Sequence, residues 1–173
     1  MLAILSIRVL SLDDAVRERG AARKAGRTVV FTNGCFDILH TGHLALLEGA
    51  KACGDLLYVG VNRDATVRGL KGAGRPIVPE EERAELIAAL RAVDVAFLFA
   101  EPTPREAIVA LCPDVLVKGG DYTPDTIVGR DEVESWGGRV VVVPLVPGRS
   151  SRGVVAEIQA RAAAPAKGRD ATC

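Results

Sequence analysis

The sequence is poor in features that mark several common protein classes. Its aromatic fraction is only 4%, which argues against a surface that stacks the bases of RNA or single-stranded DNA. Lys and Arg (22 residues) balance Asp and Glu (22 residues), so the chain lacks the overall basic character that accompanies nucleic-acid binding. We therefore expect no nucleic-acid partner.

Paired cysteines and long apolar runs are also missing. The cysteines are widely spaced, form no C-x-x-C pair and favour a reducing compartment over a disulfide framework: Cys35, Cys53, Cys112 and Cys173. No uninterrupted apolar run reaches the ~18 residues that span a membrane, and the first residues do not resemble a cleavable leader. We expect a cytoplasmic protein with no membrane partner.

The sequence does contain enough apolar material for one sizeable core. Of its 173 residues, 49% are hydrophobic and 25% are charged, a balance typical of a globular domain. Five continuous runs rich in Val, Ile, Leu and Phe indicate strands that are buried on both faces: 28–32, 56–62, 95–99, 115–118 and 139–143. Stretches with helical spacing lie between them: 44–52, 80–91, 104–111 and 126–136.

This alternation of strands and helices predicts an α/β fold. We expect a doubly wound sheet of five parallel strands, Rossmann-like in its right-handed crossovers. The sheet domain is predicted over residues 25–161, after a helical arm over 1–24 and before a flexible tail over 162–173. In such sheets ligands bind beyond the carboxyl ends of the strands, where the strand order reverses.

The two histidines of the chain stand in one of these strand-following segments. His40 and His43 follow the Asn33–Gly34 turn and open a helix that begins near Thr41. Residues three apart project from one side of a helical turn, so both imidazoles can face one ligand. The same turn supplies unpaired N–H groups and the positive end of the helix dipole. This combination favours a phosphate site.

Two other interpretations of these histidines stay open at this point. One imidazole can cap the helix while the other is satisfied in a polar pocket, which is common in proteins that bind nothing there. A zinc ion held by Cys35, His40 and His43 is the further alternative, although their spacing matches no familiar zinc motif.

Charged residues between the second and third expected strands have either a structural or a functional interpretation. Lys71 and Arg75 stand in a glycine-rich stretch that suits either a loop closing over phosphates or a solvated basic loop. Arg83 either contacts a nucleotide or forms a surface pair with Glu80.

The ends of two predicted strands offer further polar candidates. Asn62 and Asp64 either cap the next helix or contact a ligand. After the fourth strand, Lys118 precedes two glycines, Gly119 and Gly120, which allow a flat ring to approach the backbone. Asp121 can accept hydrogen bonds from ribose hydroxyls or an exocyclic amine.

Four motifs in the chain resemble those of one enzyme family. The run 32–43 (TNGCFDILHTGH) is similar to the phosphate-binding signature of the HxGH nucleotidyltransferase superfamily. Together with 61–64 (VNRD), 70–76 (LKGAGRP) and 113–122 (PDVLVKGGDY), it most resembles the bacterial heptose 1-phosphate adenylyltransferases. The similarity extends over about residues 29–158.

The resemblance implies a reaction and its reactants. A phosphate oxygen of a sugar 1-phosphate attacks the α-phosphorus of ATP, pyrophosphate leaves and an ADP-sugar forms, with Mg²⁺ accompanying the triphosphate. The resemblance also implies a homodimer, and a sugar kinase that this chain is too short to contain and that we expect as a separate protein. No protein ligand for a metal is assigned.

The resemblance also assigns roles to residues. Catalysis falls to His40, His43 and Lys71. Nucleotide binding is assigned to Asn33, Gly34, Cys35, Phe36, Gly42, Arg83, Lys118, Gly119, Gly120, Asp121, Gly148, Ser150 and Ser151. Binding of the sugar phosphate is assigned to Asp37, Asn62, Asp64 and Arg75.

One motif departs from the family pattern. The family reads Gly-x-Ser-Thr-Thr before its last helix, whereas this chain reads GRSSR over 148–152, with Arg152 in place of a hydroxyl. The departure bears on the identity of the nucleotide and the acceptor and not on the reaction class. Transfer of CMP or GMP to glycerol 3-phosphate or another sugar phosphate is the alternative activity, and a non-catalytic nucleotide-binding regulator is the alternative outside enzymes.

Overall fold

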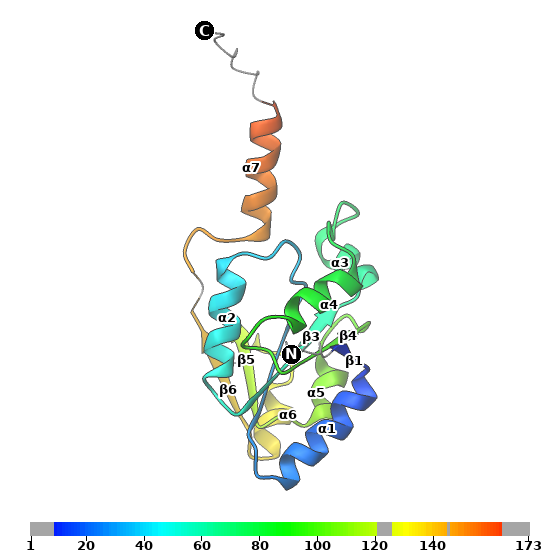
Figure 1. The fold of residues 1–173 in the computed structure, drawn as a ribbon, viewed down its shortest axis with the longest axis vertical. Helices are drawn as coiled ribbons and strands as arrows, with labels where there is room; N and C mark the ends of the chain where they lie inside the picture. Colours follow the sequence, from blue (N-terminus) through cyan, green and yellow to red (C-terminus); the bar gives the residue numbers. More distant parts are fainter. Residues whose placement is uncertain (1–8, 121–125, 145, 164–173) are drawn as a thin grey trace, which may run out of the picture.

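The computed structural model describes residues 9–120, 126–144 and 146–163 (Figure 1). The described elements follow one another as alternating strands and helices. In chain order they are β1 (Val9–Leu10), α1 (Leu12–Lys24), β2 (Val29–Gly34), α2 (Thr41–Lys51), β3 (Leu56–Asn62), α3 (Asp64–Lys71), α4 (Glu80–Ala88), β4 (Val95–Phe99), α5 (Arg105–Leu111), β5 (Val115–Gly119), α6 (Arg130–Ser135), β6 (Arg139–Val143) and α7 (Ser151–Ala163).

The strands form one parallel sheet in the order β1-β4-β3-β2-β5-β6. From β2 the chain moves outward through β3 and β4, and it then returns to the other side of β2 to add β5 and β6. The strand order therefore reverses between β2 and β5. In a doubly wound sheet, this reversal opens a crevice at the carboxyl ends of the two strands.

The sheet has six strands rather than the five expected from the sequence, because β1 adds one edge. Val9 and Leu10 pair with Ala96 and Phe97 of β4, and a two-residue strand is too short to produce an apolar run in the sequence. The sequence predicts a helical arm over 1–24. In the structure, α1 begins after Ser11 and packs in the core that β4 and β2 line.

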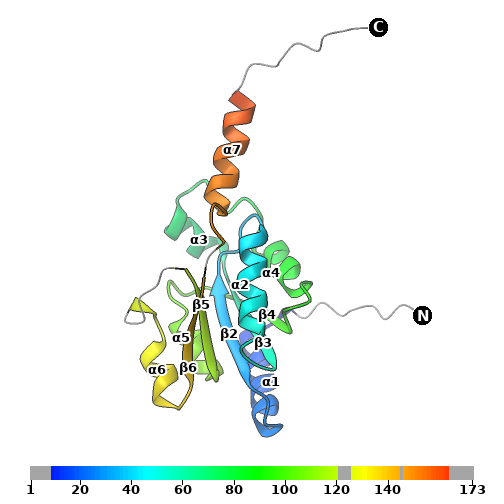
Figure 2. The same ribbon diagram turned by 90° about the vertical axis from the view of Figure 1, so that its left-hand side faces the viewer.

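Helices cover both faces of the sheet (Figure 2). On one face, α1, α5 and α6 pack on strand residues that include Phe31, Phe97 and Leu116. On the other face, α2 and α4 pack on residues that include Val30, Val59 and Val117. Alternate residues of each strand thus enter opposite cores, which explains why the strands read as unbroken apolar runs.

The clearest departures from the expected helices are in α6, α4 and α3. α6 begins at Arg130 instead of Thr126, because Gly129 has φ +89° and a Cβ there would lie 2.4 Å from Ile108. α4 ends at Ala88, before the expected Arg91. α3 occupies 64–71, so that Lys71 ends a helix and does not stand within a loop.

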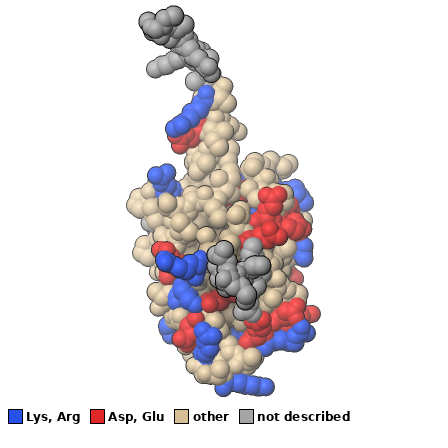
Figure 3. All heavy atoms as spheres, viewed as in Figure 1, with Lys and Arg blue, Asp and Glu red and all other residues tan. Residues whose placement is uncertain are grey.

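α7 projects from the carboxyl ends of the strands along the long axis of the molecule (Figures 1 and 2). Ser151 at its start is buried, whereas residues 156–163 are exposed. The helix reaches Ala163, two residues into the expected tail, of which 164–173 lie outside the described residues. No helix in the described parts of the chain has the length and apolarity to cross a bilayer. On the face drawn in Figure 3, basic and acidic side chains are interspersed.

Candidate functional site

The two histidines form the start of α2. His40 is its N-cap, and its Nδ1 accepts a hydrogen bond from the N–H of Gly42 at 3.1 Å. Nδ1 of His43 accepts from the N–H of His40 at 3.4 Å, which completes a reciprocal capping box. The two rings stack with their centroids 3.9 Å apart. A Cβ at position 42 would lie 2.9 Å from Nδ1 of His40, so the cap requires glycine there.

These hydrogen bonds determine which ring nitrogen carries a proton. A nitrogen that accepts from a backbone N–H is unprotonated, so each neutral imidazole carries its hydrogen on Nε2. Burial and the nearby charges of His40 and Lys71 lower the pKa of His43 to about 4, despite an opposing effect of Asp37. Burial and the charges of Arg149 and Lys71 also lower the pKa of His40. At neutral pH the pair is therefore uncharged and presents two Nε2–H donors.

The lowered pKa of His43 predicts a loss of stability in mild acid. Between pH 6.5 and about 4 the unfolded chain binds a proton at His43 that the folded protein does not bind. The free energy of unfolding should therefore fall as the pH drops through this range, by about 2–3 kcal/mol in total from this group. Urea unfolding at several pH values measures the fall, and His43→Gln, which keeps a capping side chain, should lack this part of it. Parallel curves for both proteins would contradict the lowered pKa.

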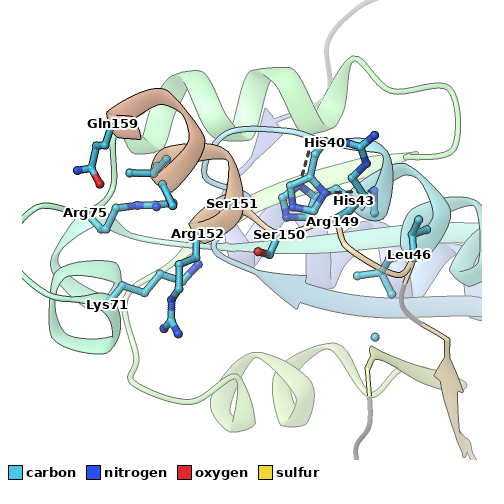
Figure 4. A pocket seen from close by; sticks show the side chains of 15 residues that line it. His40, His43, Leu46, Lys71, Arg75, Arg149, Ser150, Ser151, Arg152 and Gln159 are labelled. Carbon is cyan, nitrogen blue, oxygen red and sulfur yellow. Dashed lines mark hydrogen bonds between the residues drawn. The ribbon is translucent and has the colours of Figure 1, made fainter. Parts of the chain in front are cut away.

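The imidazole pair lines a cavity of about 620 Å³ between the starts of α2 and α7 and the end of α3. Figure 4 shows Arg149 and Ser150 beside the rings, with Lys71, Arg152 and Arg75 on the far side of Ser150. The start of α7 adds further hydrogen-bond donors. The N–H of Gly153 is already engaged, because it donates to Ser150 Oγ at 3.0 Å. The other N–H groups of the first turn have no partner within the helix.

The charge around this cavity is all positive. Among the described residues that line it, four are Lys or Arg and none is Asp or Glu. Only Arg75 is paired with a carboxylate, that of Asp37; in the described part of the chain Lys71, Arg149 and Arg152 make no ion pair. Arg152 also stands in the first turn of α7, where the helix dipole disfavours a cation. The arrangement suits a polyanion such as a triphosphate.

Eight of the twenty residues expected in the site line this cavity. Those that line it are His40, Gly42, His43, Lys71, Arg75, Gly119, Ser150 and Ser151. Those that are described but do not line it are Asn33, Gly34, Cys35, Phe36, Asp37, Asn62, Asp64, Arg83, Lys118, Gly120 and Gly148. Asp121 lies outside the described residues. Phe36 helps to hold His43 in place, because its buried ring packs edge-on against the imidazole with the two ring centroids 5.4 Å apart.

Arg83 lies beneath the site. It is almost completely buried, and its guanidinium donates to the carbonyl oxygens of Cys35, Asn62 and Val78 and to the carboxylate of Asp64. The alternative surface pair with Glu80 is not formed, since Glu80 pairs with Arg63. In this structure Arg83 joins the ends of β2 and β3 to Val78, which lies two residues before α4, and its donors are engaged within the protein.

Asn62 and Asp64 do not cap α3. The N-cap of that helix is Arg63, which makes no side-chain capping bond. Asp64 instead pairs with Arg83 at 2.7 Å, and the buried Asn62 lies near the thiol of Cys35. Both residues thus belong to the support of the β2 and β3 ends.

Lys118 and Asn33 meet across β2 and β5. The ammonium of Lys118 donates to Oδ1 of Asn33, and burial lowers the pKa of this lysine to about 8. Strand alternation places both on the face that carries Phe31 and Leu116, which is the face opposite α2 and the histidines.

One side of α7 contributes lining residues that the motif comparison did not assign. Val155, Ala156 and Gln159 line the cavity together with Arg152. Their spacing of three, four and seven residues from Arg152 is that of a single helix face. This helical period was the available signal, although nothing in the sequence showed that the helix would lie against the histidines.

The zinc alternative has no support in this geometry. In the ranges 9–120, 126–144 and 146–163, no group of three His, Cys, Asp or Glu side chains could hold a metal ion. The nearby carboxylates of Asp37 and Asp64 are taken up by arginines. The described lining of the cavity offers a metal no carboxylate, so a magnesium ion there would have to be held by substrate phosphates and water.

A parallel sheet with two helix starts and paired imidazoles at its reversal point defines a phosphate-binding α/β protein of the nucleotidyltransferase type. The chain belongs to the cytidylyltransferase-like family, which matches residues 31–162.

Named relatives agree with this assignment. The chain is 55% identical over 136 residues to the bifunctional protein HldE of Syntrophotalea carbinolica, covering 79% of this chain and 28% of that protein. It is 48% identical over 168 residues to HldE of Trichlorobacter lovleyi, covering 93% of this chain and 34% of the relative. The chain thus spans about a third of the length of these relatives.

Two solved structures resemble the fold. A lipopolysaccharide core biosynthesis protein from Thermoplasma volcanium is 34% identical, with a TM-score of 0.58, over 70% of this chain and 98% of that protein. A pantoate-beta-alanine ligase from Francisella tularensis is only 14% identical, with a TM-score of 0.57 over 84% of this chain and 69% of the ligase, and shows the shared fold alone.

Proposed function

We propose that the protein transfers AMP from ATP to D-glycero-β-D-manno-heptose 1-phosphate, releasing pyrophosphate and forming an ADP-heptose. The observation that carries this proposal is the stacked His40–His43 pair, whose Nδ1 atoms accept backbone hydrogen bonds, beside a cavity whose described lining has no carboxylate and has three cations that make no ion pair within the described residues. The similarity to a lipopolysaccharide core biosynthesis protein supports the choice of a sugar acceptor.

The geometry suits in-line displacement at the α-phosphorus. The phosphate oxygen of the acceptor forms the new P–O bond while the bond to pyrophosphate breaks, so negative charge grows on the bridging oxygen of the leaving group. Two neutral Nε2–H groups and the N–H groups at the helix starts can donate hydrogen bonds to this charge without a change in the protonation state of the histidines. Lys71, Arg149 and Arg152 offset the charge of the bound phosphates, and the main contribution of the protein is positioning.

The proposal extends to other components of the reaction. Mg²⁺ bound to the triphosphate would reduce its charge as the acceptor approaches. The acceptor carries a phosphate on its anomeric oxygen, so a kinase must supply it; we propose that this kinase is a separate protein and that the present chain acts as a cytoplasmic homodimer.

The chosen substrates are tested by release of pyrophosphate. Wild-type protein with ATP, Mg²⁺ and the heptose 1-phosphate should release pyrophosphate, while CTP or GTP, or glycerol 3-phosphate as acceptor, should give much lower rates. Lys71→Ala, prepared in the same way, controls for contaminating enzymes. A preference for CTP with glycerol 3-phosphate would establish the rival transferase. Binding of ATP without release of pyrophosphate from any sugar 1-phosphate would instead favour the regulator.

A further inference from the structure

The segment that carries Lys71 has few contacts of its own. Residues 68–74, at the end of α3 and just beyond it, are all exposed, and Val67 is the only buried residue of the helix. Glycines at 69, 72 and 74 have open space around them. Such a segment has little packing to fix a side chain against the cavity.

A buried carboxylate from the histidine loop holds the far end of this segment. Asp37, three residues before His40, has a completely buried side chain. It accepts from Arg75 Nε at 2.5 Å, from the N–H of Ile77 at 3.0 Å and from the N–H of Val78 at 3.1 Å. Burial alone would raise the pKa of Asp37, but these backbone and arginine donors outweigh it and the pKa lies below its ordinary value.

One backbone turn connects Arg75 to Lys71, so that the restraint that Asp37 places on Arg75 also acts on the lysine. The N–H of Arg75 donates to the carbonyl oxygen of Gly72 at 3.1 Å, and Gly72 ends α3 directly after Lys71. Fixing Arg75 therefore fixes the turn that follows the lysine. The charge of Lys71 acts on both imidazoles, as the lowered pKa values of His40 and His43 show.

We propose that Asp37 is a positioning residue that couples the histidine loop to Lys71, and that it contacts no substrate itself. This inference rests on the proposed function, in which Lys71 faces the reacting phosphates. Asp37 lies below the cavity surface, and its carboxylate is occupied by three donors of the protein. Arg75, with only 14% of its side chain exposed, acts mainly as the ion-pair partner through which Asp37 is connected to Lys71.

A double-substitution cycle tests the coupling. Turnover is measured for wild type, Asp37→Asn, Lys71→Ala and the combined variant. We expect Lys71→Ala to lower turnover by about 10²-fold and Asp37→Asn by about tenfold. If Asp37 acts through Lys71, the combined variant should match Lys71→Ala within about threefold. A product of the two losses, near 10³-fold, would overturn the proposal.

The same cycle applied to ATP affinity separates this inference from the assignment of the acceptor. The dissociation constant of ATP requires no acceptor, so coupling between positions 37 and 71 is measurable even if no sugar phosphate reacts. Absence of turnover would then count against the proposed function alone. Additive effects on ATP affinity in an active enzyme would count against the role of Asp37 alone.

Two further variants distinguish positioning from loss of stability. Asp114→Asn removes another structural carboxylate, one that accepts from Arg19 and the N–H of Val29 at the amino ends of β2 and β5, and it should leave turnover unchanged. Arg75→Gln leaves the backbone hydrogen bonds of Asp37 in place. Combined with Lys71→Ala, it should lower turnover no further than Lys71→Ala alone. This combination tests the proposal if Asp37→Asn does not fold. Equal losses in Asp114→Asn and Asp37→Asn would overturn the proposal.

Discussion

Replacement of His43 by alanine is expected to lower turnover by about 10²-fold or more, the usual cost of losing one donor to a transition state. His43 lines the cavity, and its Nδ1 is engaged by the backbone of His40, which leaves Nε2–H as the group that can donate to a ligand. The negative charge that this N–H group would stabilise, on the oxygen of the leaving group, is greatest when the bond to pyrophosphate breaks. The loss should therefore be larger in kcat than in the affinity for ATP, which steady-state kinetics and direct binding measure separately.

A second substitution separates this chemical role from the capping role. His43→Ala also removes one bond of the capping box, which costs about 1 kcal/mol of stability. Glutamine is a usual residue at this third helical position, so His43→Gln should restore the stability but not the turnover. A folded His43→Ala protein with turnover within a few fold of wild type would remove His43 from the reaction.

The largest effect on stability is expected at Arg83. Arg83→Met should lower the free energy of unfolding by about 3–5 kcal/mol, the cost of breaking a buried ionic network by removing one partner. The substitution leaves the carboxylate of Asp64 and three carbonyl oxygens without their donor. Chemical denaturation measures the loss.

A matched surface arginine provides the control. Arg63→Met removes the ion pair with Glu80, in which 46% of the Arg63 side chain is exposed, and should cost at most about 1 kcal/mol. Arg83→Lys should recover only part of the loss, because one ammonium cannot reach four acceptors with guanidinium geometry. If Arg83→Met and Arg63→Met were equally stable, the buried network would have no special importance.

The sheet was largely predictable because most of its strands are buried on both faces. The strands at 56–62, 95–99 and 139–143 have the expected boundaries, since an unbroken apolar run is the direct signature of burial between two helical layers. β1 was missed because two residues at an edge leave no pattern. The start of α6 was misplaced because it depends on the positive φ of Gly129, where a Cβ would meet Ile108, a residue far away in the sequence.

The candidate site was predictable where neighbouring residues form it. The histidines share one helical turn, so their spacing alone indicated a common ligand. The buried contacts of Asp37 and Arg83 were not predictable from spacing, because their partners lie up to 48 residues away and only the fold brings them together. Polar residues after a strand can thus face a ligand or hold the loops that face it, and burial decides between the two.

The central claim is that both histidines present neutral Nε2–H groups to a polyphosphate. The chain contains two histidines, so nitrogen NMR of protein labelled with ¹⁵N-histidine reports only four ring nitrogens. At pH 7 we expect both rings in the tautomer protonated on Nε2, and both Nε2 signals should shift when a non-hydrolysable ATP analogue is added. Rings protonated on Nδ1, or Nε2 signals unmoved by a saturating amount of the analogue, would contradict the claim.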